Sequence, residues 1–281
     1  MTVKTNQVLQ PKNKNQKPIV YDLYYKDSEQ PLPVVIFAHG YKGFKDWGPW
    51  HLVAEAFANA EMCSIKFNFS HNGGTVEQPI DFPDLEAFAQ NNYSIELDDL
   101  KRVIDFVETE NGKSLPKAST ISLIGHSRGG GVCLIKAEED SRIDKVVGWA
   151  SVCDFVPRFR PDTEDFQDWK KTGVTYIENT RTKQNLPHYF QFYEDFKANE
   201  ERFTIKRAVK SLKKPLLILQ GDADTSVVPA EAQALHRWSE NGVLKMLPNA
   251  DHVFGGSHPW TENTLPTDLK TVVDATIDFI K

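Results

Sequence analysis

The stretch Ile121-Ser122-Leu123-Ile124-Gly125-His126-Ser127-Arg128-Gly129-Gly130-Gly131 decides the fold of this 281-residue chain. A short apolar run, too brief for a helix, ends in Gly-x-Ser-x-Gly and passes directly into a helical pattern over residues 132–139. In this context the motif predicts a tight strand–turn–helix connection, in which the glycines leave room for neighbouring backbone and the serine is strained. We therefore expect Ser127 Oγ at the carboxyl edge of a sheet, close to the positive end of the following helix.

The composition indicates a globular protein, because 40% of the residues are hydrophobic and 26% are charged. The net charge of −6 argues against nucleic acid or an anionic membrane as a partner. Residues 1–10 are polar and contain no apolar segment typical of a signal peptide, and no apolar run is long enough to span a bilayer. We therefore expect a cytoplasmic protein. Cys63, Cys133 and Cys153 show no metal or redox spacing, which predicts reduced core residues.

Strand and helix patterns alternate along most of the chain. Strands are expected at 18–25, at the sheet edge, and at 33–38, 63–69, 145–152, 215–220 and 243–247, in addition to the strand before Ser127. Helices are expected at 49–60, 96–108, 132–139, 229–240 and 267–280. This alternation predicts a largely parallel sheet covered on both faces. Residues 1–17 are rich in Asn, Gln and Lys and predict a flexible arm, whereas 18–154 and 211–281 predict one core domain.

Residues 155–210 differ from the rest because they show no clear strand and are rich in aromatic residues. A segment of this length is expected to carry structure of its own in a compact domain. We interpret it as a helical cap, or lid, because aromatic lids suit apolar ligand pockets. The alternative is an insertion that packs away from the functional site.

The strand–turn–helix motif around Ser127 resembles the nucleophile elbow of the α/β-hydrolase superfamily. This resemblance implies the α/β-hydrolase fold, with a mostly parallel central sheet, helices on both faces and a helical cap insertion. A serine hydroxyl needs a base and an orienting acid to act as a nucleophile, and in the superfamily they follow it in the order acid, then histidine. The segment Gly221-Asp222-Ala223-Asp224-Thr225-Ser226-Val227-Val228-Pro229 resembles the family's acid loop and implies Asp224 as the acid, with Asp222 as the alternative.

The base is expected after the last strand. There, Ala250-Asp251-His252-Val253-Phe254 resembles the histidine loop of the superfamily and implies His252 as the general base. His258 is the alternative, but Pro259 and its later position fit the pattern less well.

Stabilisation of the developing oxyanion requires backbone N–H donors. The amide of Arg128 is one candidate, because it directly follows Ser127 at the start of a helix. The His39-Gly40-Tyr41 loop resembles the superfamily's second donor loop and implies the amide of Tyr41 as the other donor. His39 is then expected to hold this loop by hydrogen bonding. Lys42, Lys45 and Asp46 are expected to form a solvated rim that could touch substrate.

No cofactor and no metal are expected. The glycines of residues 125–131 lack the Gly-Lys-Ser/Thr ending of a phosphate loop and the spacing of a dinucleotide fingerprint. His71 has no partner at a spacing useful for a metal site, so a hydrogen-bonding role in its loop is expected instead.

The combined motifs look closest to dienelactone-hydrolase-like and acyl-peptidase-like esterases. Dienelactone hydrolases use a cysteine nucleophile where this chain has Ser127, which favours a carboxylesterase. The resemblance implies a small-molecule ester substrate with an apolar or aromatic acyl group, cleaved through an acyl-enzyme, and it allows a homodimer. An acyl-peptide hydrolase or peptidase with the same triad, and a non-catalytic ligand receptor on the same fold, are the alternatives.

Overall fold

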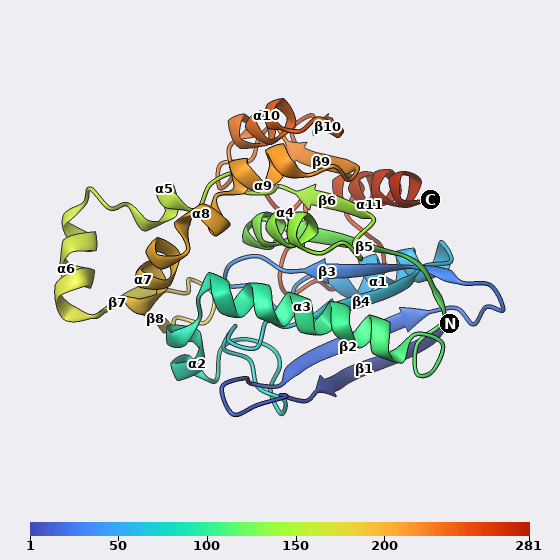
Figure 1. Ribbon diagram of the computed structural model, residues 1–281, viewed down its shortest axis with the longest axis horizontal. Coiled ribbons are helices and arrows are strands. Elements are labelled where there is room, and N and C mark those ends of the chain that lie inside the picture. The colour runs from blue at the N-terminus through green and yellow to red at the C-terminus, as the bar shows by residue number, and fades with distance from the viewer.

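A computed structural model describes all of residues 1–281 and contains a central sheet of eight strands (Figure 1). The two strands at one end are antiparallel to their neighbours, and all other neighbouring strands are parallel. In spatial order the strands are β1 (Thr2–Leu9), β2 (Ile19–Tyr25), β4 (Cys63–Phe67), β3 (Leu32–Ala38), β5 (Ala118–His126), β6 (Lys145–Trp149), β9 (Leu216–Gly221) and β10 (Gly242–Leu247). The expected mostly parallel sheet is therefore confirmed.

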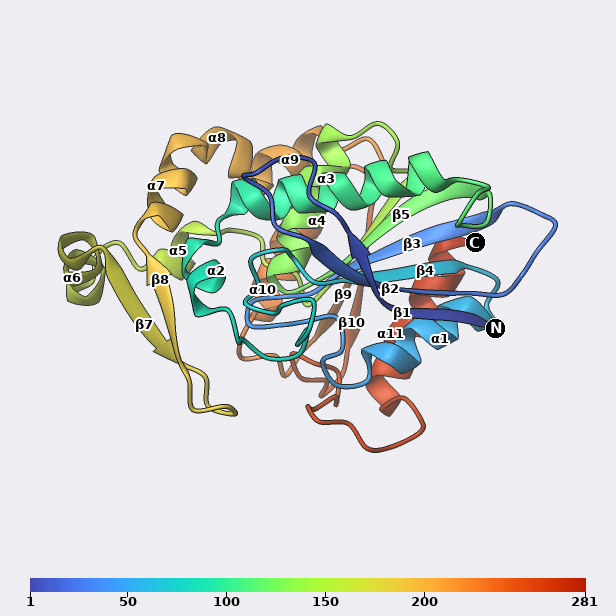
Figure 2. The same cartoon turned by 90° about the horizontal axis from the view of Figure 1, so that it is seen from below.

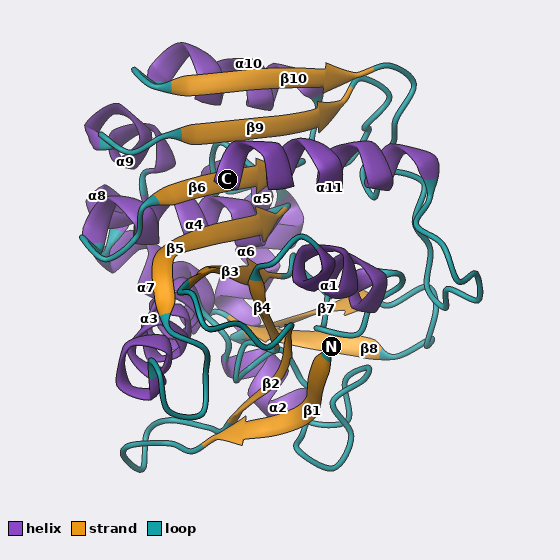
Figure 3. Cartoon of the chain, turned by 90° about the vertical axis from the view of Figure 1, so that its right-hand side faces the viewer, coloured by secondary structure: helices purple, strands orange, loops and turns teal.

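Helices cover both faces of the sheet, as Figure 3 shows from the side. One face carries α1 (Trp50–Asn59) and α11 (Thr267–Ile280). The other carries α3 (Tyr93–Glu110), α4 (Arg128–Glu139), α9 (Ile205–Ser211) and α10 (Pro229–Trp238), and the short α2 (Leu85–Gln90) lies near one end of α3. A separate apolar cluster fills the space between each helix layer and the sheet. The central strands are accordingly apolar on both faces, because each face is buried.

The register of the parallel strands brings their carboxyl ends to one edge. Ala38 pairs with Gly125, His126 with Trp149, and Gly221 with Leu247. The segments that carry the predicted site residues leave the sheet directly after these pairs. The sheet thus gathers loops that are distant in sequence at a single edge, which faces the inserted segment (Figure 1).

The N-terminal segment corrects one expectation. Residues 2–9, expected to belong to a flexible arm, form the edge strand β1, which pairs with β2 along most of its length. The strand expected at 18–25 and at the sheet edge corresponds to β2, which is second from the edge. An edge strand has one open side and can be polar, so the composition of β1 did not distinguish it from a solvated arm.

Residues 155–210, expected to form the cap, also depart in part from expectation. Residues 205–210 belong to α9, which packs against α4 of the sheet domain, so we call residues 155–204 the cap. They include helices α5 (Val156–Phe159), α6 (Glu164–Thr172), α7 (Gln191–Ala198) and α8 (Glu200–Phe203), but also an antiparallel pair, β7 (Val174–Glu178) and β8 (Asn185–Tyr189). The hairpin extends away from the sheet (Figure 2). Its strands are only five residues long, and such short runs carry too few residues for a clear period of two. The cap is therefore mixed rather than purely helical.

Most aromatic side chains of the cap are packed inside it. Phe159, Phe166, Trp169, Phe192 and Phe196 are each at most 8% exposed, and they contact one another. They join the main core through Tyr93 of α3, whose ring lies 4.9 Å from that of Phe192. These residues form the interior that lets the insertion fold.

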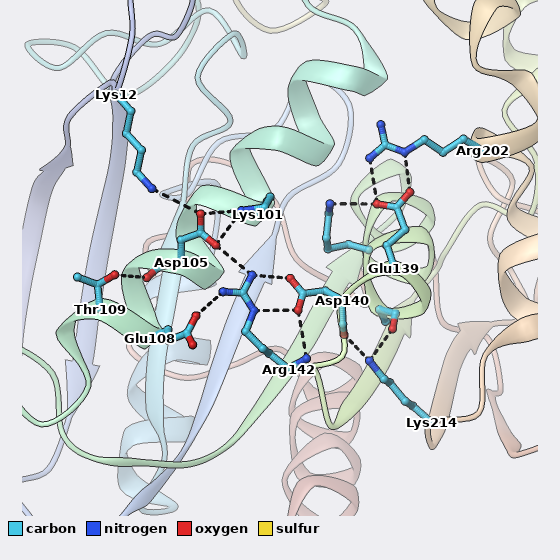
Figure 4. Close-up of polar contacts among 12 residues, drawn as sticks. Lys12, Lys101, Asp105, Glu108, Thr109, Glu139, Asp140, Arg142, Arg202 and Lys214 are labelled. Carbon is cyan, nitrogen blue, oxygen red and sulfur yellow. Dashed lines mark hydrogen bonds and ion pairs between the residues drawn. The ribbon is translucent and has the colours of Figure 1, made fainter.

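Ion pairs also connect the cap to the sheet domain. Arg202 of α8 donates two hydrogen bonds to Glu139 at the end of α4, at 2.6 and 2.9 Å (Figure 4). A neighbouring network joins Arg142 to Asp105, Glu108 and Asp140, and thereby links α3 to the end of α4 (Figure 4). These groups are partly exposed, so each pair contributes modestly to stability.

Two remaining observations concern the whole chain. The three cysteines are free; Cys63 and Cys133 are buried, as expected for core residues, whereas Cys153 is only partly buried. None of the helices combines the length and the apolar character needed to cross a bilayer.

Candidate active site

Ser127 occupies the tight turn predicted between β5 and α4. Its backbone has φ 57° and ψ −120°, a conformation that L-residues rarely adopt. Its amide donates to the Trp149 carbonyl at 2.9 Å, which fixes the turn to the neighbouring strand. The two motif glycines are required because of close contacts: a Cβ on Gly125 would lie 2.3 Å from the Gly129 oxygen, and one on Gly129 would lie 2.4 Å from the Ala38 oxygen. The backbone therefore determines where Ser127 is presented.

Asp224 and His252 are in direct contact. His252 Nδ1 lies 2.8 Å from Asp224 Oδ2. Asp224 is 3% exposed, and its other oxygen accepts hydrogen bonds from the amides of Ser226 and Val227 at 2.8 and 2.9 Å. Burial alone would raise the pKa of Asp224, but the hydrogen bonds from His252 and the two amides outweigh it and lower the pKa. The carboxylate is therefore ionised and able to hold the histidine ring.

The two alternative residues have other partners. Asp222 accepts a hydrogen bond from the Asn249 amide at 2.6 Å, which ties the acid loop to the histidine loop. His258 accepts a hydrogen bond from the Gly48 amide at its Nδ1, at 2.8 Å. Neither contact forms an Asp–His pair, so the structure brings together the preferred residues, Asp224 and His252.

His126, the variable residue of the Gly-x-Ser-x-Gly motif, supports the histidine loop. Its Nε2 lies 2.9 Å from the His252 carbonyl, and the two rings are 4.8 Å apart. Burial lowers the pKa of His126 to about 3, so the ring is neutral and its Nε2–H donates to the carbonyl. This role is not visible in the sequence, because the motif allows any residue at this position. The residue before Ser127 thus positions the backbone of His252.

Tyr41 lies at the tip of a turn beside Ser127. The Gly43 amide donates to the Gly40 carbonyl at 3.0 Å, and Lys42 has φ 56°. A Cβ on Gly40 would lie 2.9 Å from Ser127 Cβ, so the turn packs directly on the elbow. The Tyr41 amide donates to no protein acceptor. The Arg128 amide belongs to the first turn of α4, where amides have no partner within the helix. Both predicted donors therefore flank Ser127.

His39 holds this turn, as expected. Burial lowers the pKa of His39 to about 4, so its ring is neutral. Nδ1 donates to the Gly40 carbonyl at 2.9 Å, and Nε2 accepts from the Phe69 amide at 3.3 Å. His71 also takes part in a loop hydrogen bond, with the Ser70 hydroxyl at 2.8 Å.

Lys45 and Asp46 do not form the expected solvated rim. Lys45 is 1% exposed, and it pairs with Asp46 and with Asp22 of β2. Lys66 of β4 pairs with the same two carboxylates. Burial would raise the pKa of Asp46, but the two lysines lower it to about 2. The alternation of two positive and two negative groups makes burial tolerable, and it anchors the Tyr41 loop to the sheet.

The role of the Arg128 side chain is likewise not visible in the motif, which implies a role only for the Arg128 amide. Its guanidinium pairs with Glu96 of α3 at 3.2 Å and lies 4.3 Å from the centre of the Tyr41 ring. It also lies 5.2 Å from the ring centre of Phe192 in the cap. Arg128 thus contacts α3, the Tyr41 loop and the cap at once.

A small polar cavity lies behind the Tyr41 loop. Its volume is about 20 Å³, enough for roughly one water molecule. It is lined by His39, Tyr41, Glu96, Arg128 and His188, among others. No group of three or more His, Cys, Asp or Glu side chains lies together in a way that could hold a metal ion.

Comparisons with known proteins identify a family and a shared fold. A family model described as "Putative esterase" matches residues 12–270. Among solved structures, Est1E from Butyrivibrio proteoclasticus superposes with a TM-score of 0.71 at 16% identity, covering 97% of each chain. Est1E with ferulic acid bound has a TM-score of 0.68 at 18% identity, covering 94% of each chain. Dienelactone hydrolase from Anabaena variabilis has a TM-score of 0.63 at 17% identity, covering 99% of this chain and 96% of that one. No curated protein matches the chain in sequence. At these identities the structures show a shared fold.

Proposed function

The chain belongs to the esterase family, and from this premise we propose that it is a serine hydrolase that cleaves carboxylic esters through an acyl-enzyme. The observation that carries the proposal is the contact of 2.8 Å between His252 Nδ1 and Asp224 Oδ2, with the His252 carbonyl held 2.9 Å from Nε2 of His126, the residue before the strained Ser127. With Nδ1 engaged by the carboxylate, Nε2 is the ring nitrogen free to accept a proton.

In the proposed mechanism, Ser127 Oγ attacks the ester carbonyl while His252 Nε2 takes its proton. His252 then gives the proton to the leaving alcohol, and the acyl group remains on Ser127. In the second half His252 takes a proton from a water molecule as its oxygen attacks the acyl carbon, and it returns the proton to Ser127 Oγ when the acid is released. Asp224 holds the imidazole and stabilises its charged form. The amides of Tyr41 and Arg128 donate to the oxyanion, and each such donor contributes about 10²–10³ in rate.

We further propose a small to medium ester with an apolar or aromatic acyl group. The complex of Est1E with ferulic acid supports this, since it shows an aromatic acid bound to a protein of the same fold. The aromatic residues inside the cap support it less than expected, because they pack against one another. The homodimer stays a prediction.

The test is a turnover panel of p-nitrophenyl, feruloyl and aminoacyl anilide substrates, with wild type beside Ser127→Ala. We expect ester turnover with a preference for apolar or aromatic acyl groups, and a loss of about 10⁴-fold or more in the variant. A fluorophosphonate probe should label wild type at one site and leave Ser127→Ala unlabelled. Anilide cleavage at rates equal to ester cleavage would favour a peptidase. Ester turnover that survives the substitution would overturn the assignment of the nucleophile.

A further inference from the structure

The cap contacts the oxyanion loop through one hydrogen bond. His188 on β8 places its Nε2 2.7 Å from the Tyr41 hydroxyl, and its ring lies 5.6 Å from the Tyr41 ring. His188 is 6% exposed. The residue whose amide we assign to the oxyanion is therefore linked, through its own side chain, to a strand of the cap.

The surroundings fix both partners of this bond. The Tyr41 ring is covered by the Arg128 guanidinium at 4.3 Å. The His188 ring stacks on Phe192 at 6.0 Å, and its carbonyl accepts a hydrogen bond from Trp169 Nε1 at 2.8 Å. Residues of β8, α6 and α7 thus hold the histidine, so the position of the cap determines the position of the Tyr41 hydroxyl.

Both groups stay neutral over the usual working range of pH. Burial lowers the pKa of His188 to about 3 and raises that of Tyr41 to about 12. The phenol O–H of Tyr41 is more acidic than the N–H of a neutral imidazole. The Tyr41 hydroxyl therefore donates the hydrogen bond and His188 Nε2 accepts it. The hydrogen bond therefore persists at every pH at which the enzyme would be assayed.

We propose that His188 is a positioning residue for ester hydrolysis: by holding the Tyr41 hydroxyl, the cap fixes the Tyr41 amide in the oxyanion hole. The inference rests on the proposed function. Tyr41 is at the tip of a four-residue turn, so a movement of its side chain moves its amide. An oxyanion donor must stand within a few tenths of an ångström of its working distance, and a displacement of about 1 Å can cost up to 10²-fold in rate.

The consequence is specific to the transition state, because charge develops on the oxygen only there. Loss of the hydrogen bond is expected to lower kcat by about tenfold to hundredfold and to leave KM nearly unchanged. An arylboronic acid, which forms a tetrahedral adduct with the serine, should lose affinity in proportion to kcat/KM. A role of His188 in cap folding alone would change stability and KM instead.

The experiment compares four single variants with wild type. Tyr41→Phe deletes the hydroxyl and keeps the ring, and His188→Leu removes the acceptor. His188→Gln places an amide near the position of Nε2 and should restore most of kcat. Tyr189→Phe is the matched control: Tyr189 is the next residue on β8, and its hydroxyl donates to Glu86 of α2 at 2.6 Å without touching the oxyanion loop. This variant should retain wild-type kcat.

A double-mutant cycle completes the test. Tyr41→Phe and His188→Leu should be non-additive, so that the double variant is about as slow as either single one. Additive losses, or kcat values equal to that of Tyr189→Phe, would overturn the proposal, and Tyr41→Phe decides this even if His188→Leu fails to fold. Fluorophosphonate labelling separates the two proposals: unlabelled, inactive wild type would contradict the hydrolase, whereas labelled variants with unchanged kcat would contradict only the role of His188.

Discussion

The carboxyl edge of the sheet and the cap both contribute to the candidate site, but they are held in place in different ways. At the sheet edge, main-chain contacts determine positions: the Ser127 amide bonds to the adjacent strand, and Gly125 has no space for a Cβ. The cap is held to the domain by side chains, through packed aromatic rings around Tyr93 and ion pairs such as Arg202 with Glu139. From this difference we infer a division of roles. The sheet edge holds the proposed catalytic residues, and the cap sets the position of one proposed oxyanion donor.

The largest effect is expected at the edge. Asp224→Asn should lower kcat by about 10⁴-fold, because the amide no longer holds and stabilises the charged form of His252. The measurement is ester turnover at saturating substrate. Asp222→Asn is the matched control, since this carboxylate contacts the Asn249 amide rather than a histidine. A larger loss in Asp222→Asn than in Asp224→Asn would reverse the assignment of the acid.

Acid should destabilise both regions. Burial lowers the pKa of His39 and His71 to about 4, and of His126 and His188 to about 3. Below about pH 6.5 the unfolded chain binds protons at these positions and the folded chain does not, so stability falls as pH falls from about 6.5 to about 4. Each histidine contributes a loss of about 1.4 kcal/mol per pH unit.

Urea unfolding at pH 7.5, 6, 5 and 4.5 measures this slope. Three of the four histidines lie outside the cap, and His188→Gln removes only the cap's contribution. The pH dependence of the free energy of unfolding should therefore fall by the equivalent of about one bound proton. A free energy of unfolding that stays flat from pH 7.5 to 4.5 would contradict the prediction.

Gly125→Ala tests the rigidity of the edge. The added Cβ would lie 2.3 Å from a backbone oxygen that the packed elbow cannot easily move. We expect a loss of at least about 3 kcal/mol in the free energy of unfolding, together with loss of activity. Urea unfolding and esterase assays provide the measurement. If the Gly125→Ala variant were as stable as wild type, the turn around Ser127 would be able to relax around the added methyl group.

The smallest effect is expected for Gly173→Ala, which is the corresponding change in the cap. Gly173 follows α6 with φ 78°, and a Cβ there would meet no atom within 4 Å. Only backbone strain remains, so we expect a loss of about 1 kcal/mol and nearly unchanged kcat. The comparison of the two variants by urea unfolding measures how differently the two regions tolerate one methyl group. Equal losses of unfolding free energy in Gly125→Ala and Gly173→Ala would contradict the difference between the sheet edge and the cap.

Most elements of the core could be predicted from the sequence, because their signals are local. The predicted and observed bounds agree within a few residues for α3, for β3 and for the final helix α11. The strand β1 and the hairpin of the cap were missed, since an edge strand can be polar and a five-residue strand shows little period. Their structure depends on the partner strand rather than on their own residues.

The candidate site, like the fold, was only partly predictable from the sequence. The sequence indicated Ser127, Asp224, His252 and the loop of Tyr41 through its resemblance to superfamily motifs, each of which follows a recognisable strand. Only the tertiary structure decided that His126 supports the histidine loop, that Lys45 is buried in a charge network and that His188 reaches Tyr41. Local patterns record which backbone conformation a segment prefers, whereas a buried polar side chain takes its role from whichever partner folding brings within hydrogen-bond distance.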